Sequence, residues 1–160
     1  MDIKNVVVAG GGVLGSQIAF QAAYKGFNVK VWLRMESSIV RAKPKFERVE
    51  QIYLETLRAM KTKPAAYCRG LADRQELSEA QIDKLIEHAA HAMERIEFTL
   101  SHEEAAKDAD LVIEAIAENP TEKVEFYQTM AQYLPESTII VTNSSTILPS
   151  AFAESAGRPE

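Results

Sequence analysis

A chain of 160 residues, 46% of them hydrophobic, is long enough to bury a sizeable core and short enough to form one domain. No apolar run approaches the length that crosses a bilayer, and the opening residues lack the regions of a signal peptide, so we expect a soluble protein with no membrane partner. The single cysteine, Cys68, cannot form an internal disulfide, which favours a reducing, cytoplasmic setting.

The net charge of −5 hides an asymmetry along the chain. Residues 1–74 carry 13 Lys and Arg against 6 Asp and Glu, whereas residues 75–160 carry 5 against 17. The basic excess between Lys30 and Arg74 is typical of a site for a phosphorylated ligand, or of the solvated face of a helix. Because the chain as a whole is acidic, we expect no nucleic-acid partner.

The most informative pattern lies near the N-terminus. Three β-branched residues, Val6–Val8, predict a short buried strand. The glycines that follow, Gly10, Gly12 and Gly15, have GxGxxG spacing and open a stretch with helical periodicity. A second strand over Asn28–Leu33 closes a strand-helix-strand unit of about thirty residues. Together these features predict a dinucleotide-binding corner, with a flavin site, an S-adenosylmethionine site or a plain glycine turn as alternatives.

Each glycine of this motif has an expected role. Gly10 allows the sharp turn, Gly12 lets the backbone approach a pyrophosphate with no Cβ in the way, and Gly15 lets the helix pack closely on the strand. The phosphates then bind the free N–H groups and the positive dipole end of the helix that begins near Val13. The predicted cofactor contacts at this corner are Gly10, Gly11, Gly12, Val13, Leu14 and Gly15.

The rest of the chain alternates between helical and strand-like segments. We predict helices over residues 38–60, from 78 onward, and over 101–108, 119–134 and 149–156. We predict strands over residues 95–100, 110–117 and 138–142. This order is that of an α/β, doubly wound parallel (Rossmann) sheet with a long helical pair inserted between the second and third strands. We expect residues 1–160 to form one dinucleotide-binding domain.

Local signals mark where the helices begin. Ser78 with Gln81, and Ser101 with Glu104, have the spacing of capping boxes. The segment that starts at Asn119 supplies an N-cap residue, a proline at the first helical position and an acidic residue in the first turn.

In a doubly wound sheet, ligands bind beyond the carboxyl ends of the strands. Four separate loops lie at such ends: Gly10–Gly15, Leu33–Arg34, Ala117–Lys123 and Asn143–Thr146. We therefore expect these four loops to meet at one crevice, which would hold the ligand.

Three stretches resemble the NAD-binding domain of the L-3-hydroxyacyl-CoA dehydrogenase family, and the resemblance covers nearly the whole chain. They are the opening GGGVLGSQIAFQAAYKGFNV, the middle signature DADLVIEAIAENPTEK and the turn TNSSTIL. The resemblance implies NAD as cofactor and reversible hydride transfer between the nicotinamide and the C3 carbon of an L-3-hydroxyacyl-CoA. It also implies a homodimer, formed through a helical substrate domain that this chain lacks.

The resemblance assigns roles to residues after the later strands. Glu118 and Lys123 match positions that contact the nicotinamide nucleotide, and Ser145 matches a serine near the cofactor and the substrate oxygen. A serine hydroxyl can donate to a developing alkoxide, so Ser145 is the candidate catalytic residue. Asn143 either meets the nicotinamide ribose or forms the turn together with Ser144. The predicted cofactor contacts outside the glycine corner are Leu33, Arg34, Ala117, Glu118, Lys123, Asn143 and Ser145.

One departure from the family pattern falls at the end of the second strand. The family has an acidic residue there, whose carboxylate binds the adenosine ribose 2′-hydroxyl, but this chain has Leu33 followed by Arg34. Leucine cannot accept that hydrogen bond, and an arginine suits a 2′-phosphate. We therefore expect weakened discrimination against NADP, with Ser37 and Ser38 as further donors. Alternatively, the Glu36 carboxylate reaches the ribose, and the preference for NAD is retained.

The second departure concerns catalysis. The family's general base is a histidine in a Gly-x-His-Phe-x-Asn-Pro segment, and the chain ends at Glu160, where that segment should begin. We expect the chain to be the cofactor domain of a longer enzyme and to be inactive by itself. Two alternatives stay open: a dehydrogenase of a small hydroxy acid or sugar acid, and a nucleotide-binding module without chemistry.

The remaining polar residues receive less specific interpretations. His88 and His91 have metal-ligand spacing on one predicted helix but no third ligand, so we predict no metal site. His102 is expected to be exposed, and Glu114 to belong to the scaffold. The projecting helices carry basic residues that are candidates for the phosphates of coenzyme A: Lys43, Lys45, Arg48, Lys61 and Lys63.

Overall fold

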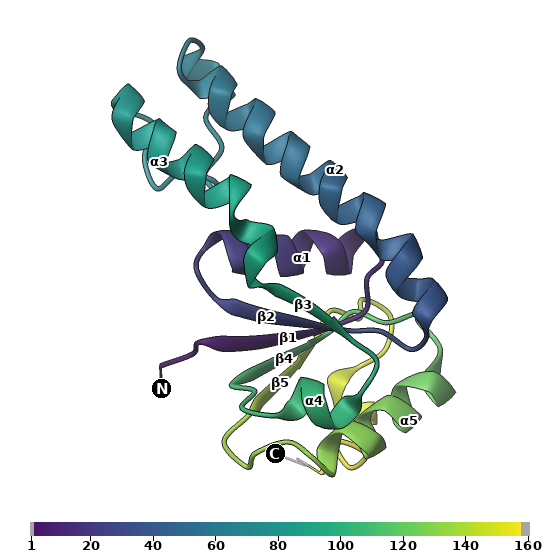
Figure 1. Cartoon of the computed structure of the whole chain (residues 1–160). Helices are drawn as coiled ribbons and strands as arrows, with labels where there is room; N and C mark the ends of the chain where they lie inside the picture. The colour runs from purple at the N-terminus through teal and green to yellow at the C-terminus, as the bar shows by residue number, and fades with distance from the viewer. Residues whose placement is uncertain (1, 158–160) are drawn as a thin grey trace.

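The computed structural model describes residues 2–157, and Figure 1 shows how its elements are arranged. Five parallel strands form one sheet in the order β3-β2-β1-β4-β5. The strands are β1 (Asn5–Ala9), β2 (Asn28–Trp32), β3 (Ile96–Thr99), β4 (Leu111–Glu114) and β5 (Ile139–Thr142). The α-helices are α1 (Val13–Tyr24), α2 (Glu36–Met60), α3 (Glu79–Ala90), α4 (His102–Ala106) and α5 (Pro120–Ala131). The predicted doubly wound parallel sheet is confirmed.

Strand β1 occupies the centre of the sheet because its side chains are apolar on both faces. Val6 and Val8 belong to the core on one face, and Val7 and Ala9 to the core on the other, as the alternation of a strand requires. Parallel pairing places Ala9 opposite Trp32 of β2 and Glu114 of β4. The carboxyl ends of these three strands are therefore level with one another.

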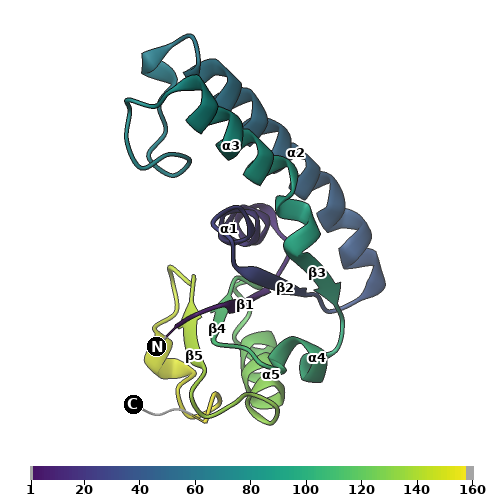
Figure 2. The ribbon, with the colours of Figure 1, turned by 60° about the vertical axis from the view of Figure 1, so that its left-hand side comes forward.

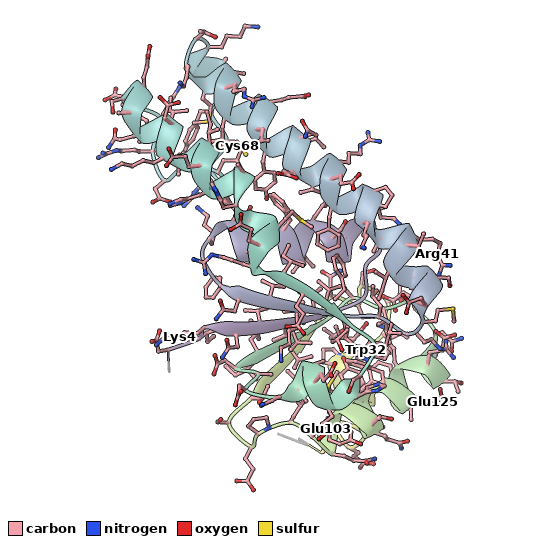
Figure 3. The ribbon with its side chains drawn as sticks, in the orientation of Figure 1. Lys4, Trp32, Arg41, Cys68, Glu103 and Glu125 are labelled. Carbon is pink, nitrogen blue, oxygen red and sulfur yellow. The ribbon has the colours of Figure 1, made fainter. Side chains whose placement is uncertain are left out.

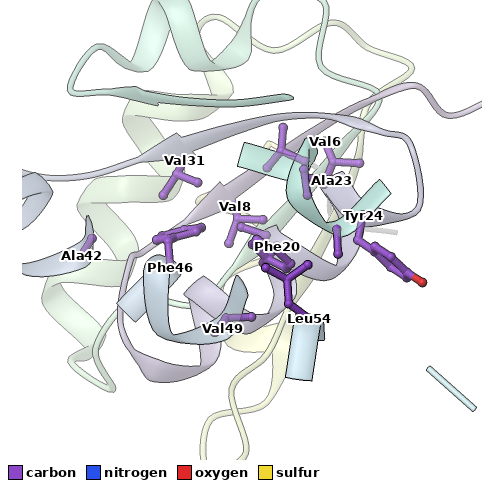
Figure 4. Close-up of a cluster of buried hydrophobic side chains, with 14 of the residues drawn as sticks. Val6, Val8, Phe20, Ala23, Tyr24, Val31, Ala42, Phe46, Val49 and Leu54 are labelled. Atoms are coloured by element: carbon purple, nitrogen blue, oxygen red, sulfur yellow. The ribbon is translucent and has the colours of Figure 1, made fainter. Parts of the chain in front are cut away.

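Helices α1 and α2 cover one face of the sheet, and α4 and α5 cover the other (Figures 1 and 2). On the first face, Phe20 of α1 and Phe46 of α2 are fully buried in a cluster with valines of β1 and β2, as Figure 4 shows. On the second face, Phe126 and Tyr127 of α5 pack in the core that includes Trp32. These two cores fix α1 and α5, which both begin at the carboxyl edge of the sheet.

Helices α2 and α3 pack against each other and extend beyond the sheet as a pair, which confirms the predicted insertion (Figure 2). Where α2 crosses α1, the ring of Tyr53 meets the rings of Phe20 and Tyr24 edge to face. The Tyr24 hydroxyl donates to the carbonyl of Leu71 at 2.7 Å. Burial raises the pKa of Tyr24 to about 12, so this hydroxyl remains a donor at neutral pH.

Two of the three predicted helix starts are confirmed in detail. Ser78 and Gln81 form a reciprocal capping box at the start of α3. At the start of α5, Asn119 Oδ1 accepts hydrogen bonds from the N–H groups of Thr121 and Glu122. Local capping chemistry therefore sets both helix boundaries.

Two local predictions are wrong. Ser101 Oγ accepts from the Glu104 N–H as expected, but the Glu104 carboxylate accepts from the Thr99 hydroxyl at 2.8 Å, so the capping box is only half formed. The predicted terminal helix is a single 3₁₀ turn, Pro149–Ala151, followed by turns to residue 157. That segment is too short to benefit from helix propagation, and no side chain caps its start.

Candidate functional site

The loop between β1 and α1 is a corner that requires glycine at two positions. Gly10 has a φ of +114°, and a Cβ on it would lie 2.4 Å from the backbone oxygen of Ala115. A Cβ on Gly15 would lie 2.1 Å from the backbone oxygen of Gly10. The corner therefore packs directly against the segment after β4. That segment leaves the sheet after Glu114, so the strand predicted to reach residue 117 is shorter than expected.

Gly12 faces open space, whereas Gly10 and Gly15 lie against backbone atoms. It is the N-cap residue of α1, its backbone is extended, and a Cβ on it would meet nothing within 4 Å. The first intrahelical bond runs from the Ser16 N–H to the Gly12 carbonyl, so the N–H groups of Val13 and Leu14 precede the hydrogen-bonded ladder. Open space in front of free N–H groups at a positive helix end fits a pyrophosphate.

A cleft of about 950 Å³ opens at the carboxyl edge of the sheet. Its volume is within the range of cofactor sites, and residues from all four predicted loops line it. The predicted residues on its wall are Gly10, Gly11, Gly12, Val13, Leu14, Gly15, Leu33, Arg34, Ala117, Glu118, Asn143 and Ser145. Of the thirteen predicted cofactor contacts, all of which are described residues, Lys123 alone is not on the wall.

Lys123 lies beneath the cleft in a hydrogen-bonded network with Glu114. Both side chains are fully buried, and Lys123 Nζ donates to Glu114 Oε2 at 2.7 Å. The same oxygen accepts from the hydroxyls of Thr142 and Tyr127, and Glu114 Oε1 accepts from the Ile116 N–H. The network therefore ties β4, β5 and α5 together directly under the loops that line the cleft.

This burial changes how Lys123 relates to the site. Its side chain has no exposed surface, and its Nζ lies 2.7 Å from Glu114 Oε2 and 3.9 Å from Glu118 Oε2. The scaffold role expected for Glu114 is confirmed, because its carboxylate joins its own strand β4 to α5 and β5. Burial, and then the Glu114 carboxylate, raise the pKa of Tyr127, which keeps its hydroxyl a donor.

Glu118 connects the loop after β4 to the loop after β5. Its Oε2 accepts from Ser144 Oγ at 2.8 Å and from Thr146 Oγ1 at 3.1 Å. Ser144 Oγ in turn accepts from the Ile147 N–H. The Ser144 hydroxyl is the main reason that the pKa of Glu118 lies below its usual value. Glu118 is therefore ionised at neutral pH and holds the second loop in place.

The two adjacent serines have different environments. The Ser144 hydroxyl forms two hydrogen bonds, whereas the exposed Ser145 hydroxyl, on the cleft wall, forms none within residues 2–157. The exposed Asn143 side chain lies on the same wall, and its backbone N–H donates to the Glu114 carbonyl at 2.8 Å. Ser144 thus forms the turn, and Ser145 presents a free hydroxyl at a fixed strand end.

At the β2 end of the cleft, Leu33 fills the space between the glycine loop and α2. The Leu33 side chain is buried, and a Cβ on Gly11 would lie 3.0 Å from Leu33 Cδ2. Arg34, by contrast, is exposed on the wall and pairs with Glu122 of α5 at 2.9 Å. Glu36, the alternative acceptor for a ribose, is not among the described residues of the wall.

The sequence interpretation missed an aromatic part of the wall. The Trp32 ring lies 4.5 Å from that of His102 and 5.1 Å from that of Phe126, centroid to centroid. His102 is half-buried, contrary to expectation, because it packs on Trp32, and burial lowers its pKa. The Trp32 indole N–H is buried with no hydrogen-bond partner among the described residues. An unpaired buried donor costs about 1–3 kcal/mol, which favours a ligand acceptor here.

The position of Trp32 was the available signal for this aromatic wall. It is the single tryptophan of the chain and stands one residue before the end of the predicted second strand.

Outside the cleft, Lys61 of α2 pairs with Asp83 of α3 at 2.5 Å. Residues 2–157 contain no group of three His, Cys, Asp or Glu side chains arranged to hold a metal ion. None of the helices in this range is long and apolar enough to cross a membrane.

The fold and the cleft define a dinucleotide-binding domain of the doubly wound type. The family model described as "3-hydroxyacyl-CoA dehydrogenase, NAD binding domain" matches residues 5–160. The chain therefore belongs to the 3-hydroxyacyl-CoA dehydrogenase family of oxidoreductases and is its NAD-binding domain.

Curated relatives agree with this assignment. The chain is 30% identical to a probable 3-hydroxybutyryl-CoA dehydrogenase of Bacillus subtilis (strain 168) over 164 residues, which cover 100% of the chain and 47% of that protein. It is 31% identical to the fatty acid oxidation complex subunit alpha of Pseudomonas syringae pv. syringae (strain B728a), covering 99% of the chain and 18% of the subunit. The chain thus spans less than half the length of these relatives.

Solved structures show the same fold. A diketoreductase structure, described for its dual catalysis of dicarbonyl compounds, has a TM-score of 0.76 and 34% identity, covering 99% of this chain and 47% of that one. The (S)-3-hydroxybutyryl-CoA dehydrogenase of Ralstonia eutropha has a TM-score of 0.71 and 24% identity with the same coverage.

Proposed function

We propose that this chain is the cofactor-binding part of an NAD(P)-dependent enzyme that interconverts the 3-hydroxyl and 3-keto groups of an acyl-CoA. The observation that carries the proposal is the free Ser145 hydroxyl on the same wall as the open glycine corner. A bound nicotinamide dinucleotide supplies the hydride donor or acceptor. The first turn of α1 binds its pyrophosphate, and the loops after β4 and β5 orient its nicotinamide end.

Ser145 is positioned by its neighbours. Because Glu118 and Ser144 hold the loop, the Ser145 hydroxyl is free to donate to the substrate C3 oxygen, where negative charge develops during reduction. The exposed Asn143 amide, on the cleft wall, suits the hydroxyls of the nicotinamide ribose. Since the chain spans 47% of the Bacillus relative, we place the general base and a helical substrate domain outside residues 1–160. Residues 1–160 then bind the nucleotide without turnover.

Trp32 provides the binding test. It is the single tryptophan and lies on the cleft wall, so NADH or NADPH should quench its fluorescence saturably, and 5′-AMP should compete. The absence of saturable quenching, together with the absence of heat in calorimetry, would contradict the proposal.

For the reaction, full-length protein should oxidise 3-hydroxybutyryl-CoA with a change in absorbance at the reduced nicotinamide band. Equal turnover by residues 1–160 alone would contradict the placement of the general base.

A second candidate keeps the chemistry and changes the substrate to a small carbonyl compound without coenzyme A. It is supported by the likeness to the diketoreductase at 34% identity. The small compounds to compare are free diketones, hydroxy acids and sugar acids. A kcat/KM for acetoacetyl-CoA at least tenfold above that for each free compound supports the acyl-CoA enzyme, and the reverse ratio supports the second candidate.

The likeness to fatty acid oxidation subunits supports a role in fatty acid metabolism. The structure offers Lys45, on the cleft wall, as a better placed partner for a ligand phosphate than Lys61, which pairs with Asp83.

We also propose that the full-length protein is cytoplasmic and forms a homodimer through the helical domain. Light scattering should then give twice the chain mass for the full-length protein, and a monomer would contradict it.

A further inference from the structure

The β2 end of the cleft carries a group of cations that the cofactor assignment does not explain. Arg34 follows β2, and Arg41 and Lys45 lie on successive turns of α2, all three on the cleft wall. Figure 3 labels Arg41 on α2 and Glu125 on α5, the helices that face each other across this end. The acidic residues on the wall lie in the β4–α5 part of the chain: Glu114, Glu118, Glu122 and Glu125.

The carboxylate that selects NAD has no counterpart at this end. In dinucleotide-binding folds, an acidic side chain at the end of the second strand accepts a hydrogen bond from the adenosine ribose 2′-hydroxyl. Leu33 stands there and is packed between the glycine loop and α2, so it offers neither an acceptor nor space for one. The surface next to this ribose position is therefore basic, and none of the described Asp or Glu residues of β2 and α2 lies on the cleft wall there.

Arg34 already binds an oxyanion across the cleft. Its Nη1 donates to Glu122 Oε1 at 2.9 Å, and both side chains are partly exposed, at 55% and 36%. An exposed pair of this kind is weak and exchangeable, because water screens it. A phosphate offers more oxygens in the geometry that a guanidinium prefers, so it can displace the carboxylate.

Arg41 is held in position by two hydroxyls at the start of α2. Its Nη1 donates to Ser37 Oγ at 3.1 Å, and its Nη2 donates to Ser38 Oγ at 2.9 Å. Lys45 Nζ donates to the Arg41 carbonyl at 2.7 Å, which keeps the ammonium near the same turn. These bonds reduce the side-chain entropy that binding would otherwise cost.

We infer that Arg34, Arg41 and Lys45 form a subsite for the 2′-phosphate of NADP(H), in which the phosphate replaces Glu122 as the partner of Arg34. Ser38, also on the wall, adds a hydroxyl donor. The inference rests on the proposed function, because it requires a nicotinamide dinucleotide in this cleft. The Glu122 carboxylate then competes with the 2′-phosphate for Arg34. Removing its charge should therefore tighten the binding of NADP(H) and leave the binding of NAD(H) unchanged.

The test uses residues 1–160 and four nucleotides in calorimetry and Trp32 fluorescence: NADPH, NADH, and the adenosine-end probes 2′,5′-ADP and 5′-AMP. NADPH should bind at least tenfold more tightly than NADH, and 2′,5′-ADP more tightly than 5′-AMP. Arg34→Gln and Arg41→Gln should each weaken NADPH at least tenfold and change NADH less than twofold. Glu122→Gln should tighten NADPH severalfold and leave NADH unchanged.

The matched control is Arg58→Gln, which removes one positive charge from an exposed position of α2 off the cleft wall. It should affect both nucleotides equally and slightly. NADPH binding no tighter than NADH binding overturns the inference, as do arginine variants that weaken both nucleotides alike. If NADH binds and NADPH does not, the subsite fails and the proposed function stands. If neither binds, the proposed function fails as well.

Discussion

The two ends of the cleft are built from different kinds of interaction. Under the loops after β4 and β5, fully buried Glu114 and Lys123 join three elements through short hydrogen bonds. At the end of β2, Arg34 and Glu122 meet as a partly exposed pair, and the Arg41 guanidinium is held by two serine hydroxyls. The partners at the first end are fully buried, whereas those at the second are partly exposed to solvent.

The largest expected effect comes from breaking the buried pair. Lys123→Met leaves the Glu114 carboxylate buried without its cation and should lower the free energy of unfolding by about 3–5 kcal/mol. Adding Glu114→Gln removes the second charge and should recover at least half of that loss. Urea denaturation of the three proteins measures both numbers. Equal losses in the single and the double variant would show that the charges are not what joins these elements.

The next effect tests the free hydroxyl at the same end. Ser145→Ala in the full-length protein should lower kcat/KM by about 10²–10³, because it removes a donor to the substrate oxygen, with little change in nucleotide affinity. Ser150, which is exposed outside the cleft, provides the matched control as Ser150→Ala. Steady-state kinetics check this, and equal activities of the two variants would remove Ser145 from the chemistry.

Glu118 should also make the stability of this end depend on pH. The pKa of Glu118 is lowered, so its bonds to Ser144 and Thr146 contribute fully above its ordinary value of 4.5 and are lost as the pH falls through the lowered value. Thermal unfolding between pH 3 and 6 should therefore show an acid loss in the wild type that Glu118→Gln reduces. If both proteins follow the same curve, the Glu118 carboxylate does not hold this loop.

The smallest effect belongs to the β2 end. Arg34→Gln breaks only a partly exposed ion pair and should change the free energy of unfolding by less than about 1 kcal/mol. Thermal or urea denaturation measures it next to Lys123→Met. A loss as large as that of the buried variant would mean that the two ends are equally structural.

The sequence predicted the order of strands and helices and the glycine corner, because both depend on residues close together in the chain. The Glu114–Lys123 network could not be predicted, since it depends on how α5 packs against β4 and β5. The Arg34–Glu122 pair joins residues 88 positions apart and needs both the loop after β2 and helix α5 in place. Trp32 and His102 meet across β2 and α4, which is why His102 was expected in solvent.

Gly12 allows the most direct test of the central claim, that a pyrophosphate rests on the backbone at the start of α1. A Cβ at this position would meet no described atom within 4 Å, so Gly12→Val should stay within about 1 kcal/mol of the wild type in unfolding free energy. The same side chain occupies the space proposed for the phosphates. Calorimetric titration with NADH and NADPH should show binding to the wild type and at least tenfold weaker binding to the variant. Equal affinities for the two folded proteins would contradict the claim.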